Sequence, residues 1–80
     1  MTQAEALEAI KSSGLQEGDS VEWNMRSGGI DCGVVSAVTE SRVYVKNQRR
    51  RTKGRGAGEL YDCEFWWDAC ELGELRKVVP

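Results

Sequence analysis

Histidine is absent from this sequence, and no catalytic motif takes its place. Histidine is the commonest general base in enzymes and the usual partner of a serine or cysteine nucleophile. Carboxylates are plentiful, but none stands in a local pattern that indicates acid–base chemistry. The sequence therefore predicts a protein that is not an enzyme.

Cysteine is scarce. The chain has Cys32, Cys63 and Cys70, an odd number, and no two of them are closer in sequence than Cys63 and Cys70. Zinc sites normally draw on paired CxxC units or on histidine. We therefore expect no metal and no other cofactor. We also expect three reduced thiols that behave as small core side chains, Cys63 above all.

Long apolar runs are missing as well, so the sequence predicts no membrane-spanning segment. Met1 begins a short acidic and polar stretch, unlike the basic region and apolar stretch of a signal peptide, and a cytoplasmic location is the expectation. The 80 residues fit one domain, 1–80, with a small core.

The first predicted element is a helix over 2–13. Thr2 and Glu5 have the spacing of a capping box, and Gly14 suits a left-handed residue after the last turn. A narrow apolar stripe at helical spacing contains Ala6, Leu7, Ala9 and Ile10. A helix this short is not stable alone, so it must pack on the rest of the chain or on a second chain.

From Leu15 onward the apolar period changes to two, which indicates strands. Val43 and Val45 are expected to point inward and Tyr44 outward. Gly33 would permit the sharp bend that a small barrel needs. Strands are predicted at 21–26, 30–38, 43–45, 59–67 and 74–79. The predicted fold is mainly β, a five-stranded SH3-like barrel over 15–79 preceded by the helix.

Three segments carry a resemblance to the SH3-like barrel superfamily, in particular to Tudor-type and KOW-type modules. They are Gly18-Asp19-x-Val21-x-Trp23, Gly29-x-x-x-Gly33-Val34-Val35-x-x-Val38 and Val43-x-Val45. The preceding helix, the spacing of Gly28 and Gly33, and Asn47 at the end of the third strand also resemble the Sm-like RNA-binding fold. The second half of the chain lacks the basic, His-containing signature of the bacterial Sm-like chaperone. The resemblance implies a fold rather than one function, because such barrels bind DNA, RNA, methylated side chains and other proteins.

Charge is distributed very unevenly. Six of the ten residues from 46 to 55 are basic, whereas the other seventy residues hold five basic and thirteen acidic side chains, a balance of −8. A Gly-rich stretch at 54–58 follows, so we expect a mobile basic loop over 46–58. Its candidate phosphate-binding residues are Lys46, Arg49, Arg50, Arg51, Lys53 and Arg55. Two alternatives stay open: an acidic protein surface as the partner, or a solvated loop that discourages strand-edge pairing.

Two aromatic residues are further candidates. Tyr44, between Arg42 and Lys46, is a possible stacking residue. Trp66 alternates with the inward residues of its strand, so it is either an exposed platform for a base or a partner protein, or a surface covered by the N-terminal helix. Trp23 is expected in the core.

Together these observations predict a non-catalytic module that binds nucleic acid, DNA or RNA, through the basic loop. The alternative is a protein-interaction module, for example a small phage or mobile-element regulator that docks on a larger complex through the loop and Trp66. The sequence does not decide whether the protein forms a homo-oligomer.

Overall fold

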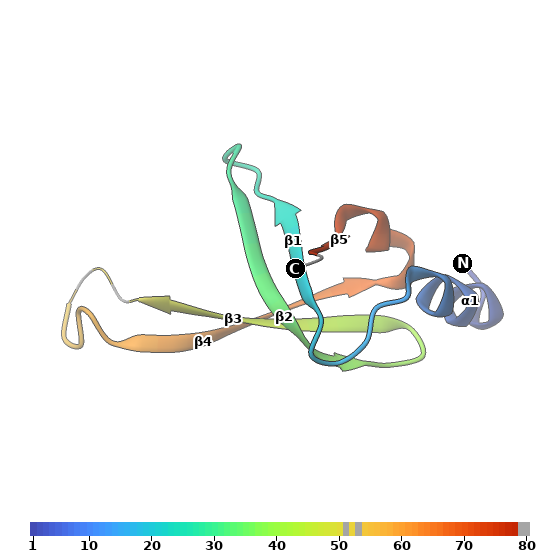
Figure 1. The fold of residues 1–80 in the computed structure, drawn as a ribbon, viewed down its shortest axis with the longest axis horizontal. Helices are drawn as coiled ribbons and strands as arrows, with labels where there is room; N and C mark the ends of the chain where they lie inside the picture. The colour runs from blue at the N-terminus through green and yellow to red at the C-terminus, as the bar shows by residue number, and fades with distance from the viewer. Residues whose placement is uncertain (51, 53, 79–80) are drawn as a thin grey trace.

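The fold is a helix followed by one bent antiparallel sheet (Figure 1). It is described from a computed structural model that covers residues 1–50, 52 and 54–78. The elements in chain order are α1 (Gln3–Ser13), β1 (Ser20–Asn24), β2 (Ile30–Val38), β3 (Arg42–Arg50), β4 (Leu60–Asp68), the 3-10 helix η1 (Ala69–Glu74) and β5 (Arg76–Lys77).

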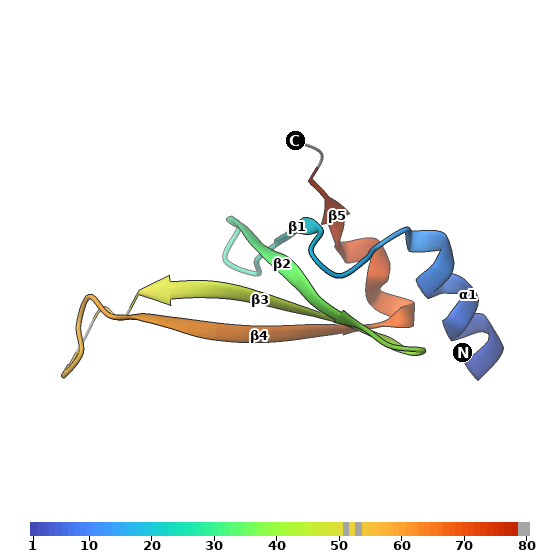
Figure 2. The same ribbon diagram turned by 60° about the horizontal axis from the view of Figure 1, so that its bottom comes forward.

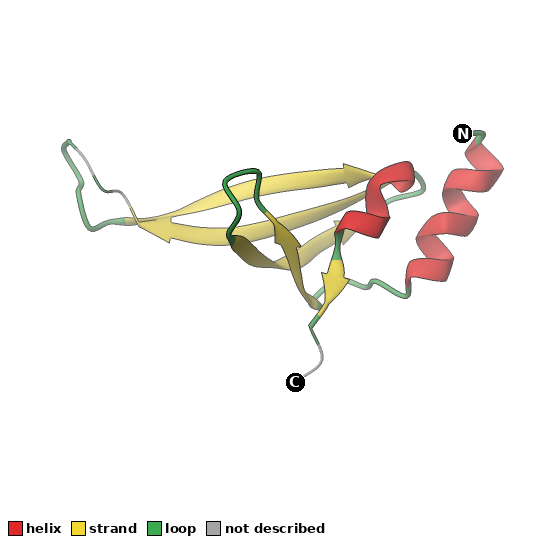
Figure 3. Ribbon diagram, turned by 90° about the horizontal axis from the view of Figure 1, so that it is seen from above, coloured by secondary structure: helices red, strands yellow, loops and turns green. Residues whose placement is uncertain are grey.

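Helix α1 has the predicted ends. The Thr2 hydroxyl accepts the backbone N–H of Glu5, and the Glu5 carboxylate accepts that of Thr2, which completes the capping box. Gly14 follows the helix with a left-handed backbone. The apolar stripe is narrower than predicted: Ala6 and Ile10 are buried, whereas Leu7 is 39% exposed. The buried side of α1 packs against η1, and Figure 3 shows the two helices side by side.

The five strands form a single sheet in the order β4-β3-β2-β1-β5, with every neighbouring pair antiparallel. β4 and β5 are its two edges and do not pair with each other, so the sheet is open rather than a closed barrel. The last strand is much shorter than the predicted 74–79. β5 has two residues, most of the expected turn and the start of that strand form η1, and residues 79 and 80 lie outside the described part.

The bend of the sheet depends on Gly33 in β2. A Cβ atom there would lie 2.6 Å from Val45 Cγ1 and 2.7 Å from the carbonyl oxygen of Lys46. Only glycine allows β2 to approach β3 this closely. Two residues later the register shifts between Val35 and Ala37, which marks a bulge. On the N-terminal side of Gly33, β2 turns away from β3, as Figures 1 and 2 show.

The core lies on the concave side of the bent sheet. Its most deeply buried side chains are Val21, Val35, Val43 and Val45. Trp23 and Trp67 pack on them with ring centres 4.8 Å apart. The inward orientation predicted for Val43, Val45 and Trp23 is therefore confirmed. The helical side of the core is closed by Ala6, Ile10, Leu15, Ala69 and Leu75.

Strands β3 and β4 continue well past the rest of the sheet as a two-stranded ribbon. The pairing of β2 with β3 ends at Lys46, whereas β3 and β4 stay paired out to Arg50 opposite Leu60. This projection gives the molecule its elongated dimensions of 46 × 25 × 22 Å (Figure 2). The predicted loop boundary is therefore wrong. Lys46, Arg49 and Arg50 belong to a strand, and the connection between the two strands spans 51–59.

Within the described part of the chain, no helix combines the length and the apolar character needed to cross a membrane.

Candidate nucleic-acid interface

The basic residues of the sequence are carried by the projecting ribbon and its tip, but they do not all have the same role. Lys46, Arg49 and Arg50 lie on β3. Arg55 lies in the Gly-rich turn between the strands and is exposed. Arg51 and Lys53, which belong to the same predicted set, are outside the described residues.

Arg49 serves the fold. It points to the concave side, where its guanidinium forms an ion pair with Asp31 of β2 and lies 5.4 Å from the centre of the Phe65 ring. Asn47, on the same side of β3, donates its Nδ2 to Asp31 Oδ1 and to the carbonyl oxygen of Cys32, both at 3.2 Å. These contacts hold β2 to the base of the ribbon. Because they occupy Arg49 with a carboxylate and an aromatic face, its predicted role in binding phosphate is not supported by the geometry.

Lys46 and Arg50 point to the opposite, outward side of the ribbon. Both residues are exposed. Arg50 Nη1 donates to the carbonyl oxygen of Gly58 at 2.6 Å, which braces the tip, and the guanidinium has further N–H donors for a ligand. Lys46 lies opposite Glu64 in the β3–β4 register. These two side chains, together with Arg55, are the described cations that an anionic ligand can reach on the ribbon.

A pocket of about 700 Å³ lies in the notch where β2 leaves the ribbon. Lys46 and Arg50 line it on the ribbon side, and Cys32 and Val34 line it on the β2 side. Val34 is 48% exposed, so the notch offers an apolar surface beside two cations. Asp62 is the acidic residue of β4 at its margin.

Strand β4 has the opposite charge. Its residues include Asp62, Glu64 and Asp68 but no basic residue. Asp68 is ion-paired with Arg42 at 2.8 Å, whereas no ion pair to Asp62 or Glu64 is found among the described residues. The ribbon is therefore basic along β3 and at its tip, and acidic along β4. An anionic ligand would be attracted to the first and repelled by the second.

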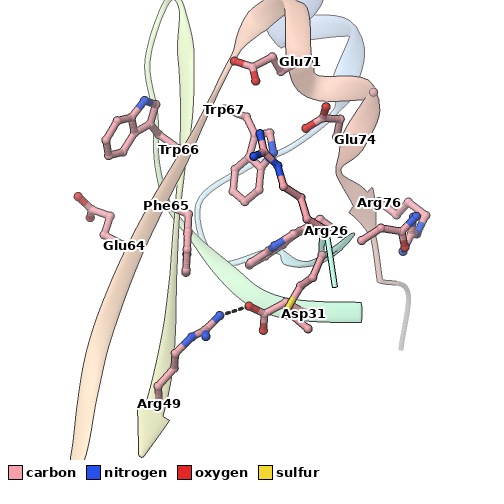
Figure 4. A pocket seen from close by; sticks show the side chains of 14 residues that line it. Arg26, Asp31, Arg49, Glu64, Phe65, Trp66, Trp67, Glu71, Glu74 and Arg76 are labelled. Carbon is pink, nitrogen blue, oxygen red and sulfur yellow. Dashed lines mark hydrogen bonds and ion pairs between the residues drawn. The ribbon is translucent and has the colours of Figure 1, made fainter. Parts of the chain in front are cut away.

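Tyr44 and Trp66 are directly opposite each other on the outward side of β3 and β4. Trp66 is 57% exposed, so the hypothesis that the N-terminal helix covers it is wrong. Figure 4 shows Trp66 and Glu64 on one side of β4, and Phe65 and Trp67 on the other. Tyr44 is half-buried, and its side chain is the first contributor, before Asp68, to a pKa of Arg42 above the ordinary value.

A second pocket, of about 870 Å³, opens on the concave side (Figure 4). Its floor is the aromatic cluster of Trp23, Phe65 and Trp67, with Arg49 and Asp31 at one end. Both tryptophans are less than 9% exposed, so the rings chiefly complete the core. The acidic residues on its rim are Asp31, Glu64, Glu71 and Glu74. Arg26, Arg49 and Arg76 line it as well, so its acidic and basic charges nearly balance.

The cysteines differ from the prediction in burial. Cys63 is only half-buried, because its part of β4 lies beyond the core, and Cys32 and Cys70 are exposed. Within residues 1–50, 52 and 54–78, no three His, Cys, Asp or Glu side chains are grouped so that they could hold a metal ion.

Asp31 and Asn47 are the residues at this site whose contacts sequence reasoning missed. Each is a single polar residue in a strand, and its partners lie on a different strand. No local sequence pattern therefore predicts the contact. Comparison of the chain with models of protein families, with curated proteins and with solved structures finds no match.

Proposed function

We propose that this protein is a non-catalytic module that binds nucleic acid through the phosphate backbone, using the β3 side and the tip of the ribbon. The observation that carries the proposal is the separation of charge. The basic run of the sequence lies on a two-stranded ribbon that extends beyond an acidic body. Such a ribbon can reach a phosphate backbone while the body stays clear of it.

The arrangement supports backbone binding more than base reading. Lys46, Arg50 and Arg55 are exposed and come from two strand positions and a turn, so they can follow a row of phosphates. Arg51 and Lys53 add two charges to the same run in the sequence. The acids of β4 confine the nucleic acid to one edge of the ribbon, which disfavours wrapping of a duplex around it.

Tyr44 and Trp66 extend this surface toward the base of the ribbon. Their side chains occupy one cross-strand pair on the outward side, next to the pair of Lys46 and Glu64. An unpaired base can stack on an exposed aromatic ring whatever its sequence. The proposed ligand is therefore single-stranded nucleic acid, or a duplex with an unpaired segment.

The SH3-like character of the fold is part of the same proposal. An antiparallel series from β1 to β4 and the return of β5 to β1 support it, as does the bend at Gly33. The open edge between β4 and β5 makes the fold an incomplete version of such a barrel.

A second function has one specific observation in its favour. Trp66, Tyr44 and Arg42 lie together on the outward side, and tryptophan, tyrosine and arginine are the residue types that dominate protein-binding hot spots. A protein partner would use this cluster without needing the basic tip. Trp66→Ala would then abolish the interaction while the basic residues remain dispensable.

The nucleic-acid proposal is tested by fluorescence anisotropy with labelled single-stranded and double-stranded oligonucleotides of mixed sequence. The variant is Arg50→Gln with Arg55→Gln, which removes two described cations of the ribbon. The matched control is Lys11→Gln with Arg26→Gln, which removes two cations from the body and so has the same net charge as the first variant. We expect strong loss of binding in the first variant only. Equal loss in both would show attraction by net charge, without a site on the ribbon.

A further inference from the structure

The outer edge of β4 is an open strand edge over residues 62–68. β4 is the last strand of the sheet, and all its ladder hydrogen bonds go to β3. Among the described residues, no backbone hydrogen bond outside the ladders starts or ends at any of residues 62–68. Figure 2 shows this edge clear of α1 and η1 along most of its length. A strand edge of this kind is a template for another strand.

The outward side chains of this edge are acidic or large and apolar. They are Leu60, Asp62, Glu64, Trp66 and Asp68. Leu60 is 56% and Trp66 57% exposed. Arg42 is ion-paired with Asp68, whereas Asp62 and Glu64, two residues apart on the same side of the strand, have no ion pair among the described residues.

A second copy of this chain does not suit the edge. In an antiparallel pairing of β4 with its own copy, the numbers of any two facing residues add up to the same sum, and this sum defines the register. The outward side chains of the two copies lie on the same face only when this sum is even. The even sums that pair at least five residues are 124, 126, 128, 130 and 132. Each of them sets two acids directly opposite, which is destabilising. The opposed pairs are Asp62 with Asp62, Asp62 with Glu64, Glu64 with Glu64, Asp62 with Asp68, and Glu64 with Asp68.

We propose that the outer edge of β4 binds an extended basic segment of a partner protein by strand addition. The segment supplies main-chain hydrogen bonds along the edge. Two basic side chains at alternate positions face Asp62 and Glu64, and an apolar side chain two positions away packs on Trp66. The charges of β4 select this partner, because they oppose both a second β4 and a phosphate backbone.

This binding site shares only Trp66 with the proposed nucleic-acid interface. Nucleic acid would use the β3 side and the tip, whereas the segment would use β4. The module would then connect a basic protein segment to a nucleic acid through opposite edges of one ribbon. Either activity can fail in an experiment while the other is retained.

The test uses a labelled peptide of eight residues in which lysine and threonine alternate. Leucine replaces the lysine at the end of the peptide. Two control peptides carry glutamate in place of lysine, or N-methyl groups on the backbone amides that would face β4. We expect saturable binding of the lysine peptide, with binding about tenfold or more weaker for each control. NMR amide shifts should change along Leu60–Asp68 and not at Arg55.

Two protein variants complete the test. Asp62→Asn with Glu64→Gln should weaken the peptide by about tenfold, whereas Glu17→Gln with Glu40→Gln, an equal charge change away from β4, should not. Thermal unfolding checks that both variants fold. Three results would overturn the proposal: no saturation by about 1 mM peptide, binding that N-methylation leaves unchanged, or a dimer of the protein joined through β4.

Discussion

Arg49 on β3 is ion-paired with Asp31 on β2, and the same guanidinium lies against the ring of Phe65. One cation of the basic run is thus a structural residue that ties the ribbon to the neighbouring hairpin. Its neighbour Arg50 points to the other side and is exposed. Two consecutive arginines should therefore respond differently to substitution.

Replacing Arg49 by Ala should lower the free energy of unfolding by about 1–2 kcal/mol, because Asp31 loses its charged partner and the Phe65 ring loses its cover. Arg50→Ala is the matched control and should change it by no more than about 0.5 kcal/mol. Urea unfolding followed by tryptophan fluorescence measures both. Equal effects of the two substitutions would mean that the Asp31 pair contributes nothing to stability.

Gly33→Ala should destabilise the protein by about 1–3 kcal/mol. The added methyl would lie 2.6 Å from Val45 Cγ1, and the backbone oxygen of Lys46 at 2.7 Å cannot rotate away. Gly73→Ala is the control, because a Cβ at Gly73 meets no atom within 4 Å. If both variants unfold at the same denaturant concentration as the unsubstituted protein, the close approach of β2 to β3 is not what requires glycine.

Asp19 gives stability a dependence on acid. Its carboxylate accepts the backbone N–H of Gln16 at 2.8 Å and pairs with Lys77 Nζ at 3.3 Å, and the Gln16 bond is the main cause of a pKa below the ordinary 3.8. A lowered pKa stabilises the fold above pH 3.8, and the contribution is lost as pH falls through the pKa of the folded state. Asp19→Asn should therefore flatten the decline of stability below pH 4. The same decline of stability below pH 4 in Asp19→Asn and in the unsubstituted protein would contradict this.

The three thiols should react at different rates in the native protein. Cys32 and Cys70 are exposed and should be labelled quickly by a small maleimide, whereas half-buried Cys63 should lag behind. Mass spectrometry of digested samples taken over time measures each site. Simultaneous labelling of all three would show that β4 opens around Cys63 as fast as the reagent reacts.

Much of the fold could be predicted from sequence because it depends on local signals. The capping box from Thr2 to Glu5 and the alternation around Val43 and Val45 act between near neighbours, and both are confirmed. Gly33 also stood out, since a glycine in a strand signals a bend or a close approach.

What could not be predicted depends on contacts between distant strands. The residues of β3 beyond Lys46 are all polar, so no alternation of apolar residues indicates a strand, and the segment resembles a loop. It is a strand because β4 pairs with it residue by residue out to Arg50. In the same way, Asp31 and Arg49 are eighteen positions apart, and only the path of β2 brings them together.

The salt dependence of oligonucleotide binding tests the central claim most directly. If Lys46, Arg50, Arg51, Lys53 and Arg55 each contact a phosphate of a single strand or duplex, the slope of log affinity against log salt should be about −3.5 to −4.5. Arg50→Gln with Arg55→Gln should reduce its magnitude by about 1.4–1.8, and Arg49→Gln should leave it nearly unchanged. Absence of binding even at about 50 mM salt, or an equal reduction by Arg49→Gln alone, would contradict a phosphate-binding ribbon.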